Sequence, residues 1–182
     1  MNGFIKLGRV SSEEWRLGER AVGAYAKARK KFCQEQGRQP KLLTGNDNKV
    51  GIAGEYWVMR YFQEWLRRTL KDRPSSSSNP GFDFRYADGP RTIRVSVKCI
   101  SKENTRGRTV RLGKAKPWGE LVLVLLGYNL RPLKFGRATK RQFRKAASNG
   151  RISDNPYVSA SWVGRKGWMS DERYGAVEDS PF

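Results

Sequence analysis

The sequence predicts an α/β fold in which a mixed central β-sheet is flanked by helices. Two stretches in the first half of the chain show the three- and four-residue apolar spacing of helices. Two segments of alternating polarity follow, and then residues 121–128 form an apolar run typical of a strand buried on both faces. The 182 residues fit one domain. We divide it into an N-terminal helical extension (1–45), a core (46–150) and a Trp- and Gly-rich C-terminal extension (151–182).

Two helices are expected before the strands. The first should follow Ser11 and end near Gln36, because Ser11 and Glu14 have the spacing of a capping box. The second, rich in aromatic and aliphatic residues, is predicted over 48–70 and should be a core helix. The stretch 72–81, which contains four consecutive serines, is predicted to be a surface loop.

The middle of the chain predicts a β-hairpin and further strands. Residues 82–86 and 92–100 alternate in polarity and are separated by an Asp-Gly turn. A short strand is expected over 109–112, before the buried strand 121–128. A short basic helix should begin after Thr139, and the C-terminal extension should be irregular or contain short strands.

Composition excludes several classes of function. The chain has no histidine, which rules out His-metal nucleases, His-Ser-Asp hydrolases and Cys₂His₂ zinc fingers. Its two cysteines, Cys33 and Cys99, cannot build a structural zinc site, and they suit a reduced, cytoplasmic protein. The longest apolar run is too short to span a membrane, and the first 20 residues do not resemble a signal peptide. We therefore expect no membrane partner.

The charge of the chain predicts a polyanionic partner. Lys and Arg number 37 against 17 Asp and Glu, giving a net charge of +20. Because the positive charge is spread along the chain, nucleic acid is favoured over an anionic membrane or an acidic protein. The candidate phosphate-binding residues are Lys140, Arg141, Arg144, Lys145, Arg165 and Lys166. The alternative is an ordinary solvated face, and Trp162 and Trp168 could either stack on bases or belong to the core.

Three side chains of the predicted hairpin share its polar face. Asp83, Ser96 and Lys98 alternate with apolar residues on the two strands. A hard cation such as Mg²⁺ (or Mn²⁺) takes oxygen ligands, and a neighbouring lysine can orient a water and offset charge on a phosphate. The alternative is that Asp83 pairs with an arginine and Lys98 is simply solvated.

The strings NPGFDF and VSVK resemble the PD-(D/E)XK nuclease superfamily, which includes many restriction endonucleases, Holliday-junction resolvases and some homing endonucleases. The matching residues are Pro80, Asp83, Ser96, Val97 and Lys98. The resemblance implies a restriction-endonuclease-like core over about 48–147. It makes Asp83 a metal ligand, the Val97 carbonyl a further ligand and Lys98 the catalytic lysine. The sequence departs from the family in two places: two residues separate Pro80 from Asp83, and Ser96 replaces the usual acidic residue.

A second carboxylate must therefore come from elsewhere. Glu55 stands on an apolar stripe of the second predicted helix, where a carboxylate needs a partner. Many members of the family place a glutamate on this helix, which makes Glu55 the preferred second metal ligand over Glu103 and Glu120. The family usually has one more strand between this helix and the aspartate strand, where the sequence predicts the Ser-rich loop.

These features predict a Mg²⁺-dependent DNA endonuclease, expected to act as a homodimer when it cuts both strands. Sequence-specific cleavage of the restriction or homing kind is preferred over a resolvase-like activity, because both ends of the chain have spare material for base-reading elements. The rival hypothesis is a non-catalytic DNA- or RNA-binding protein in which the hairpin only carries surface charge.

Overall fold

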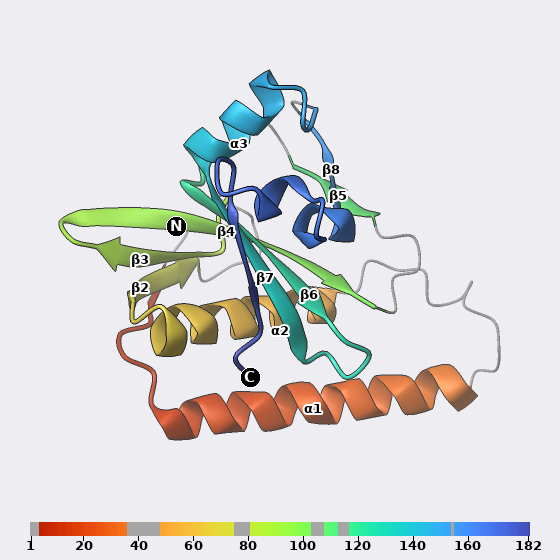
Figure 1. Ribbon diagram of the computed structural model, residues 1–182. Helices are drawn as coiled ribbons and strands as arrows, with labels where there is room; N and C mark the ends of the chain where they lie inside the picture. Colours follow the sequence, from red (N-terminus) through yellow and green to blue (C-terminus); the bar gives the residue numbers. More distant parts are fainter. Residues whose placement is uncertain (1–3, 36–47, 75–80, 103–107, 113–116, 154) are drawn as a thin grey trace.

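A computed structural model describes residues 4–35, 48–74, 81–102, 108–112, 117–153 and 155–182 (Figure 1). The helices are α1 (Ser12–Glu35), α2 (Asn48–Arg60) and α3 (Lys140–Ser148), and α2 continues into a π-helical turn, Tyr61–Trp65. The strands of the main sheet are β1 (Phe4–Lys6), β2 (Thr69–Pro74), β3 (Phe84–Asp88), β4 (Arg91–Ser101), β6 (Glu120–Leu126), β7 (Pro132–Thr139) and β9 (Ala176–Asp179). Two further strands, β5 (Arg108–Arg111) and β8 (Tyr157–Ser159), pair with each other.

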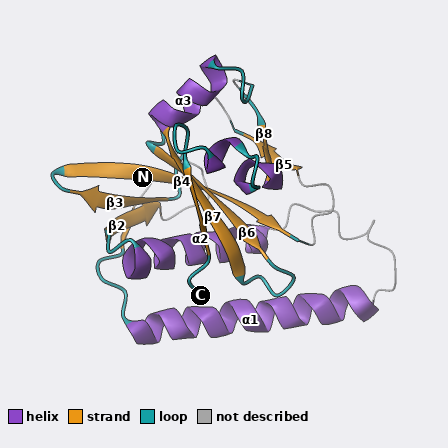
Figure 2. Ribbon diagram, viewed as in Figure 1, coloured by secondary structure: helices purple, strands orange, loops and turns teal. Residues whose placement is uncertain are grey.

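The main sheet is mixed and has helices on both faces, which confirms the predicted α/β class. Its strand order is β1-β2-β3-β4-β6-β7-β9, and β4 and β6 form its parallel pair. Helix α2 packs on one face with α1 beyond it, while α3 and the C-terminal segment lie on the other (Figures 1 and 2). None of the described helices is both long and apolar enough to cross a membrane.

The N-terminal helix begins as predicted and packs on α2. The Ser11 amide donates to the Glu14 carboxylate over 2.8 Å, and the Glu14 amide donates to the Ser11 hydroxyl over 3.2 Å, which completes the capping box. Trp15 is buried, and its carbonyl accepts a hydrogen bond from the Tyr56 hydroxyl of α2. The N-terminal extension is therefore part of the packed structure.

The predicted end of the second helix is wrong. The helix stops at Arg60 and the π turn at Trp65, and the chain then enters β2 instead of continuing to Leu70. Arg67 adopts a positive φ of 55°, a left-handed conformation that ends the helical geometry. Pairing with β3 outweighs the helical periodicity of this stretch. A strand thus separates the helix from Asp83, and the serines at 75–78 lie outside the described residues.

The hairpin and the buried strand form as predicted. In the hairpin Phe84 lies opposite Val95, and Gly89 supplies the positive φ of 58° that its turn requires. Strand β6 is buried along nearly its whole length, as expected for a central strand with packed layers on both sides. The Thr139 capping box that opens α3 is also present.

The C-terminal extension completes the fold, and the sequence did not predict how. Strand β9 pairs with the unpredicted β7 at one edge of the sheet, and the unpredicted β1 forms the other edge. Trp162 and Trp168 are 6% and 4% exposed and pack edge-on against each other. Base stacking by these two tryptophans is therefore excluded, because their rings belong to the core on the α3 side of the sheet.

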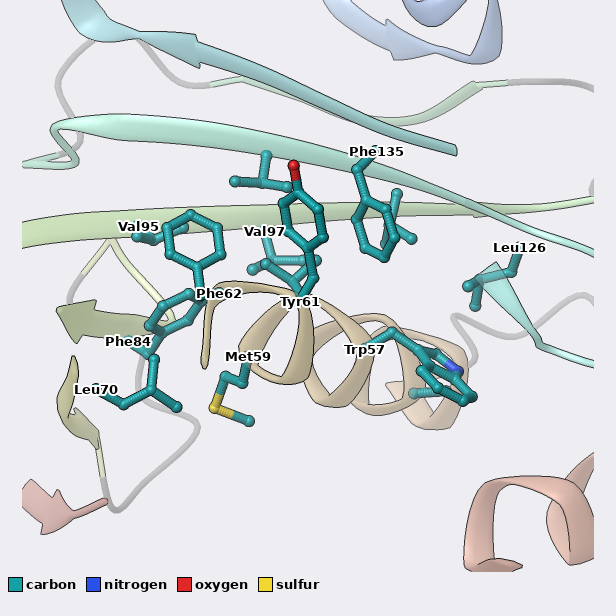
Figure 3. Packing of buried hydrophobic residues seen from close by; sticks show 14 of the residues in the cluster. Trp57, Met59, Tyr61, Phe62, Leu70, Phe84, Val95, Val97, Leu126 and Phe135 are labelled. Atoms are coloured by element: carbon teal, nitrogen blue, oxygen red, sulfur yellow. The ribbon is translucent and has the colours of Figure 1, made fainter. Parts of the chain in front are cut away.

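Helix α2 lies close to β4 because Gly54 has no side chain. A Cβ atom at Gly54 would lie 2.7 Å from Cβ and 2.9 Å from Sγ of Cys99. Aromatic side chains of α2 and its π turn fill the neighbouring space against the sheet (Figure 3). The contact at Gly54 thus fixes the distance between the helix and the strand.

We expect Gly54→Ala to destabilise the protein, because the added methyl group must push α2 away from β4. Overpacking of this kind costs about 1–3 kcal/mol. The matched control is Gly51→Ala on the same helix, where a Cβ would meet no atom within 4 Å. That change should stabilise the protein by about 0.5–1 kcal/mol through helix propensity. Urea unfolding of both variants checks the prediction, and equal effects of the two changes would contradict it.

Candidate functional site

Asp83 is held across the start of the hairpin by two backbone contacts. Its amide donates to the Val95 carbonyl over 2.8 Å, and its carboxylate Oδ2 accepts from the Val97 amide over 2.6 Å. The side chain therefore lies along β4 at Val97, the residue before Lys98, instead of extending freely into solvent. A carboxylate that accepts a backbone hydrogen bond is fixed in orientation, as a metal ligand needs to be.

Glu55 occupies the neighbouring position on α2, directly after Gly54. Burial, and after it the negative charge of Asp83, raise the pKa of the Glu55 carboxyl from 4.5 to about 7. The positive charges of Arg73 and Lys98 act against this rise. Among the described residues, the Glu55 side chain has no ion pair or hydrogen bond. The charges of Asp83 and Lys98, which lie just before β3 and on β4, thus both act on the Glu55 carboxyl of α2.

Lys98 and Ser96 stand on β4 in different surroundings. Lys98 is half-buried, and its charge acts on Glu55. Ser96 is only 2% exposed and lies beside Leu121 of the parallel strand. Its hydroxyl is thus withdrawn from solvent, and it adds no charge to the group. Pro80, the other residue of the sequence match, lies outside the described residues.

Arg73 is a member of this group that the sequence did not single out. It lies on β2, whose last three residues fall within the predicted loop 72–81, and its charge lowers the pKa of Glu55. Leu70 and Asp72 are both buried on this strand, but its sequence TLKDRP shows no apolar alternation that would have predicted it. The aromatic helical pattern just before it favoured a helix up to Leu70 instead.

The two downstream carboxylates do not join the site. Glu103 lies outside the described residues. Glu120 is 4% exposed and accepts hydrogen bonds from the Tyr86 hydroxyl over 2.9 Å and from Arg137 over 2.8 Å. A buried carboxylate with such partners is a structural ion pair. Glu55 therefore remains the second carboxylate beside Asp83.

The oxygen donors at this place fit a hard divalent cation better than a softer one. In the described part of the chain, no group of three or more His, Cys, Asp or Glu side chains is arranged to hold a metal ion. Two carboxylates are nevertheless what Mg²⁺ commonly takes from a protein, because it keeps several of its waters. The mutual repulsion that raises the pKa of Glu55 is also what a divalent cation between two carboxylates would relieve. Asp83 and Glu55, with the Val97 carbonyl, are the residues that would hold it.

The residues expected to bind phosphates lie on the α3 side of the sheet. Arg141, Arg144 and Lys145 are exposed along α3, and Lys140 at its start places its ammonium 5.3 Å from the ring centre of Trp118. Arg165 and Lys166 are exposed in the segment that follows the short helical turn Ala160–Val163. Six cations are therefore displayed on the elements that cover one face of the sheet.

Neither the family models nor the curated proteins contain a match to this chain. The residues of the site therefore carry the functional argument by themselves.

The raised pKa of Glu55 predicts an unusual dependence of stability on pH. From about pH 4.5 to 7 the folded state holds the Glu55 proton that the unfolded chain has lost, so stability falls as the pH rises through this range. Relative to wild type, Glu55→Gln should therefore gain about 3 kcal/mol between pH 4.5 and 8. Urea unfolding in EDTA at both pH values measures this difference.

The control for this experiment is Glu64→Gln, which removes a carboxylate paired with Arg60 over 2.8 Å. This change should leave the pH dependence as it is in wild type. If Glu55→Gln follows wild type at both pH values, the Glu55 carboxyl is not perturbed as described.

Proposed function

We propose that the protein is a Mg²⁺-dependent endodeoxyribonuclease that hydrolyses phosphodiester bonds. The observation that carries this proposal is that the charges of Asp83 and Lys98 both act on the partly buried Glu55 carboxyl. Two acids and a lysine on different elements are a costly arrangement unless they bind a cation and act on a phosphate.

The fold supports the resemblance to the PD-(D/E)XK nucleases at a place where the sequence had predicted a loop instead of a strand. Strand β2 lies between the glutamate helix and the aspartate strand, as is usual in that family. The Glu on the helix compensates for Ser96, which stands at the usual acidic position. Pairing of β2 with β3 also brings Arg73 toward the carboxylates.

Each side chain has a distinct role in the proposed reaction. Asp83 and Glu55 would hold the ion, which when bound polarises the phosphate and activates a water. Lys98 positions the attacking water and offsets negative charge that develops on the scissile phosphate. Glu55 must be ionised to contribute, so a proton on its carboxyl competes with the ion as the pH falls, and the positive charge of Arg73 favours the ionised form.

The fold restricts which elements could recognise a particular kind of DNA. Because α1 and the C-terminal segment pack into the domain, base-reading elements are limited to exposed faces such as those of α1 and α3. Sequence-specific cleavage as a homodimer remains the subtype that we propose, since two sites would serve the two strands. A resolvase-like preference for branched DNA is the second candidate.

Cleavage in millimolar Mg²⁺ should depend on each member of the site. We expect Asp83→Asn, Glu55→Gln and Lys98→Met to lower the rate by about 10²–10⁴-fold, the range for loss of a catalytic or charge-stabilising group. The measurement follows plasmid nicking and cleavage of labelled duplex, single-stranded and branched DNA. Lys102→Ala is the matched control, because this exposed lysine follows the end of β4.

Two outcomes would overturn the nuclease proposal. One is wild-type protein that cuts none of the three substrates with Mg²⁺ or Mn²⁺. The other is metal-dependent cleavage that the site variants retain at the level of Lys102→Ala. DNA binding without any cleavage would favour the non-catalytic nucleic-acid-binding protein.

Metal binding can be tested without a substrate. Mg²⁺ should raise the melting temperature of wild type, because a ligand that binds only the folded state stabilises it. A gain of 1 kcal/mol corresponds to about 2–4 °C for a domain of this size. The shift should disappear in Asp83→Asn and Glu55→Gln and persist in Lys102→Ala. An equal shift in all four proteins would place the ion elsewhere.

A further inference from the structure

A row of cations crosses the main sheet beside the candidate site. The strand register places Lys6 opposite Asp72, Asp72 opposite Arg85, and Arg85 opposite Arg94. The row continues through Gly119, whose amide donates to the Arg94 carbonyl and whose carbonyl accepts from the Lys140 amide, each over 2.8 Å. We call Lys6, Asp72, Arg85, Arg94 and Lys140 the cationic row. It carries four cations against one carboxylate.

Contacts with a carboxylate and with aromatic rings fix the two arginines of the row and leave positive charge on the surface. Arg85 forms a bidentate pair with the buried Asp72, over 2.6 and 2.7 Å, and its guanidinium lies 4.6 Å from the ring centre of Phe4. The guanidinium of Arg94 lies 5.6 Å from the ring centre of Phe82. An arginine on an aromatic face is oriented while the edge of its guanidinium can still donate to a phosphate.

Arg94 and Lys6 provide the charge of the row that is open to a partner. Arg94 is exposed, and no described carboxylate pairs with it. The Lys6 side chain is 87% exposed and lies 4.0 Å from Asp72, at the limit of an ion pair. Figure 1 shows the β3–β4 hairpin extending beyond α3, so among the described elements no helix covers this part of the α3-side face. The surface is therefore positive and accessible.

The row and Lys98, one member of the candidate site, share the α3-side face of β4. Arg94 and Lys98 are four residues apart on the strand, so their side chains point the same way, about 13 Å apart along it. Neighbouring strands add about 4.8 Å for each step across the row. Cations fixed at successive strand positions match a polyanion with regularly spaced charges, which an acidic protein surface or a lipid bilayer does not offer.

We propose that the cationic row binds the sugar–phosphate backbone of duplex DNA and so holds the strand whose scissile phosphate enters the Asp83–Lys98 site. The choice of DNA rests on the proposed function, whereas the role of the row as a backbone-binding surface rests on its own geometry. Contacts of this type position the duplex and do not read its sequence.

The salt dependence of DNA binding tests this role. Fluorescence anisotropy would follow two labelled duplexes of different sequence in EDTA, where binding is measured without cleavage. We expect Arg94→Gln to weaken both duplexes equally and to lower the slope of log K against log[salt] by about 0.9, the value for one lost phosphate contact. Lys6→Gln/Arg94→Gln should lower it by about twice as much. The matched control is Arg16→Gln, which removes an exposed arginine from α1 on the other side of the sheet.

Each outcome decides between the proposals. The row is rejected if both row variants keep the affinity and salt slope of Arg16→Gln, even when the protein cleaves DNA. The row is also rejected as a DNA-binding surface if both row variants lose binding to anionic lipid vesicles but keep their binding to DNA. If the row variants lose phosphate contacts but wild type cuts no DNA, the backbone surface stands and the nuclease proposal falls. Because Arg94 and Lys6 are exposed, thermal melting should show the variants to be folded.

Discussion

The close approach of α2 to β4 at Gly54 is the constraint on which the rest of the site depends. With only a hydrogen at this position, the helix backbone comes within van der Waals distance of the Cys99 side chain. The next residue, Glu55, is thereby carried into partly buried space beside the sheet. Burial of its carboxyl in this space is the main cause of its raised pKa. The packing of α2 on β4 and the raised pKa of Glu55 therefore both follow from the close approach at Gly54.

Sequence patterns predict the elements of this fold where a local rule is strong. The capping boxes at Ser11 and Thr139 and the Asp-Gly turn each rest on neighbouring residues, and all three form. Strands β1, β2 and β7 were missed, and β9 was expected only as one of the unplaced short strands of the C-terminal extension. An aromatic helical pattern precedes β2, and the pairing partners of β1 and β9 are distant in sequence. Such strands are defined by long-range pairing, which periodicity within one segment does not reveal.

The residues of the candidate site likewise divide into those that local sequence patterns predict and those that they do not. Asp83, Ser96 and Lys98 could be found because strand alternation places their side chains. Glu55 was found as a carboxylate on an apolar stripe, a local conflict that marked it as unusual. Arg73 was not found, because it belongs to the strand that the sequence presented as a loop. The two C-terminal tryptophans were ambiguous, because composition alone cannot separate a stacking ring from a core ring.

Three carboxylates of the described sheet and of α2, namely Asp72, Glu120 and Glu55, differ in whether a partner offsets the cost of their desolvation. This difference distinguishes the two structural acids from the candidate functional one. Asp72 is held by Arg85, and Glu120 by Arg137 and Tyr86, so each has partners that offset its desolvation. Glu55 has no such partner among the described residues, and its nearest carboxylate, Asp83, makes its ionised form less favourable. An apolar or amide side chain would relieve this cost without disturbing the packing at Gly54. A residue that weakens the fold in this way is best explained by a ligand that it binds, and the divalent cation that we propose beside Asp83 and Lys98 would offset the two negative charges.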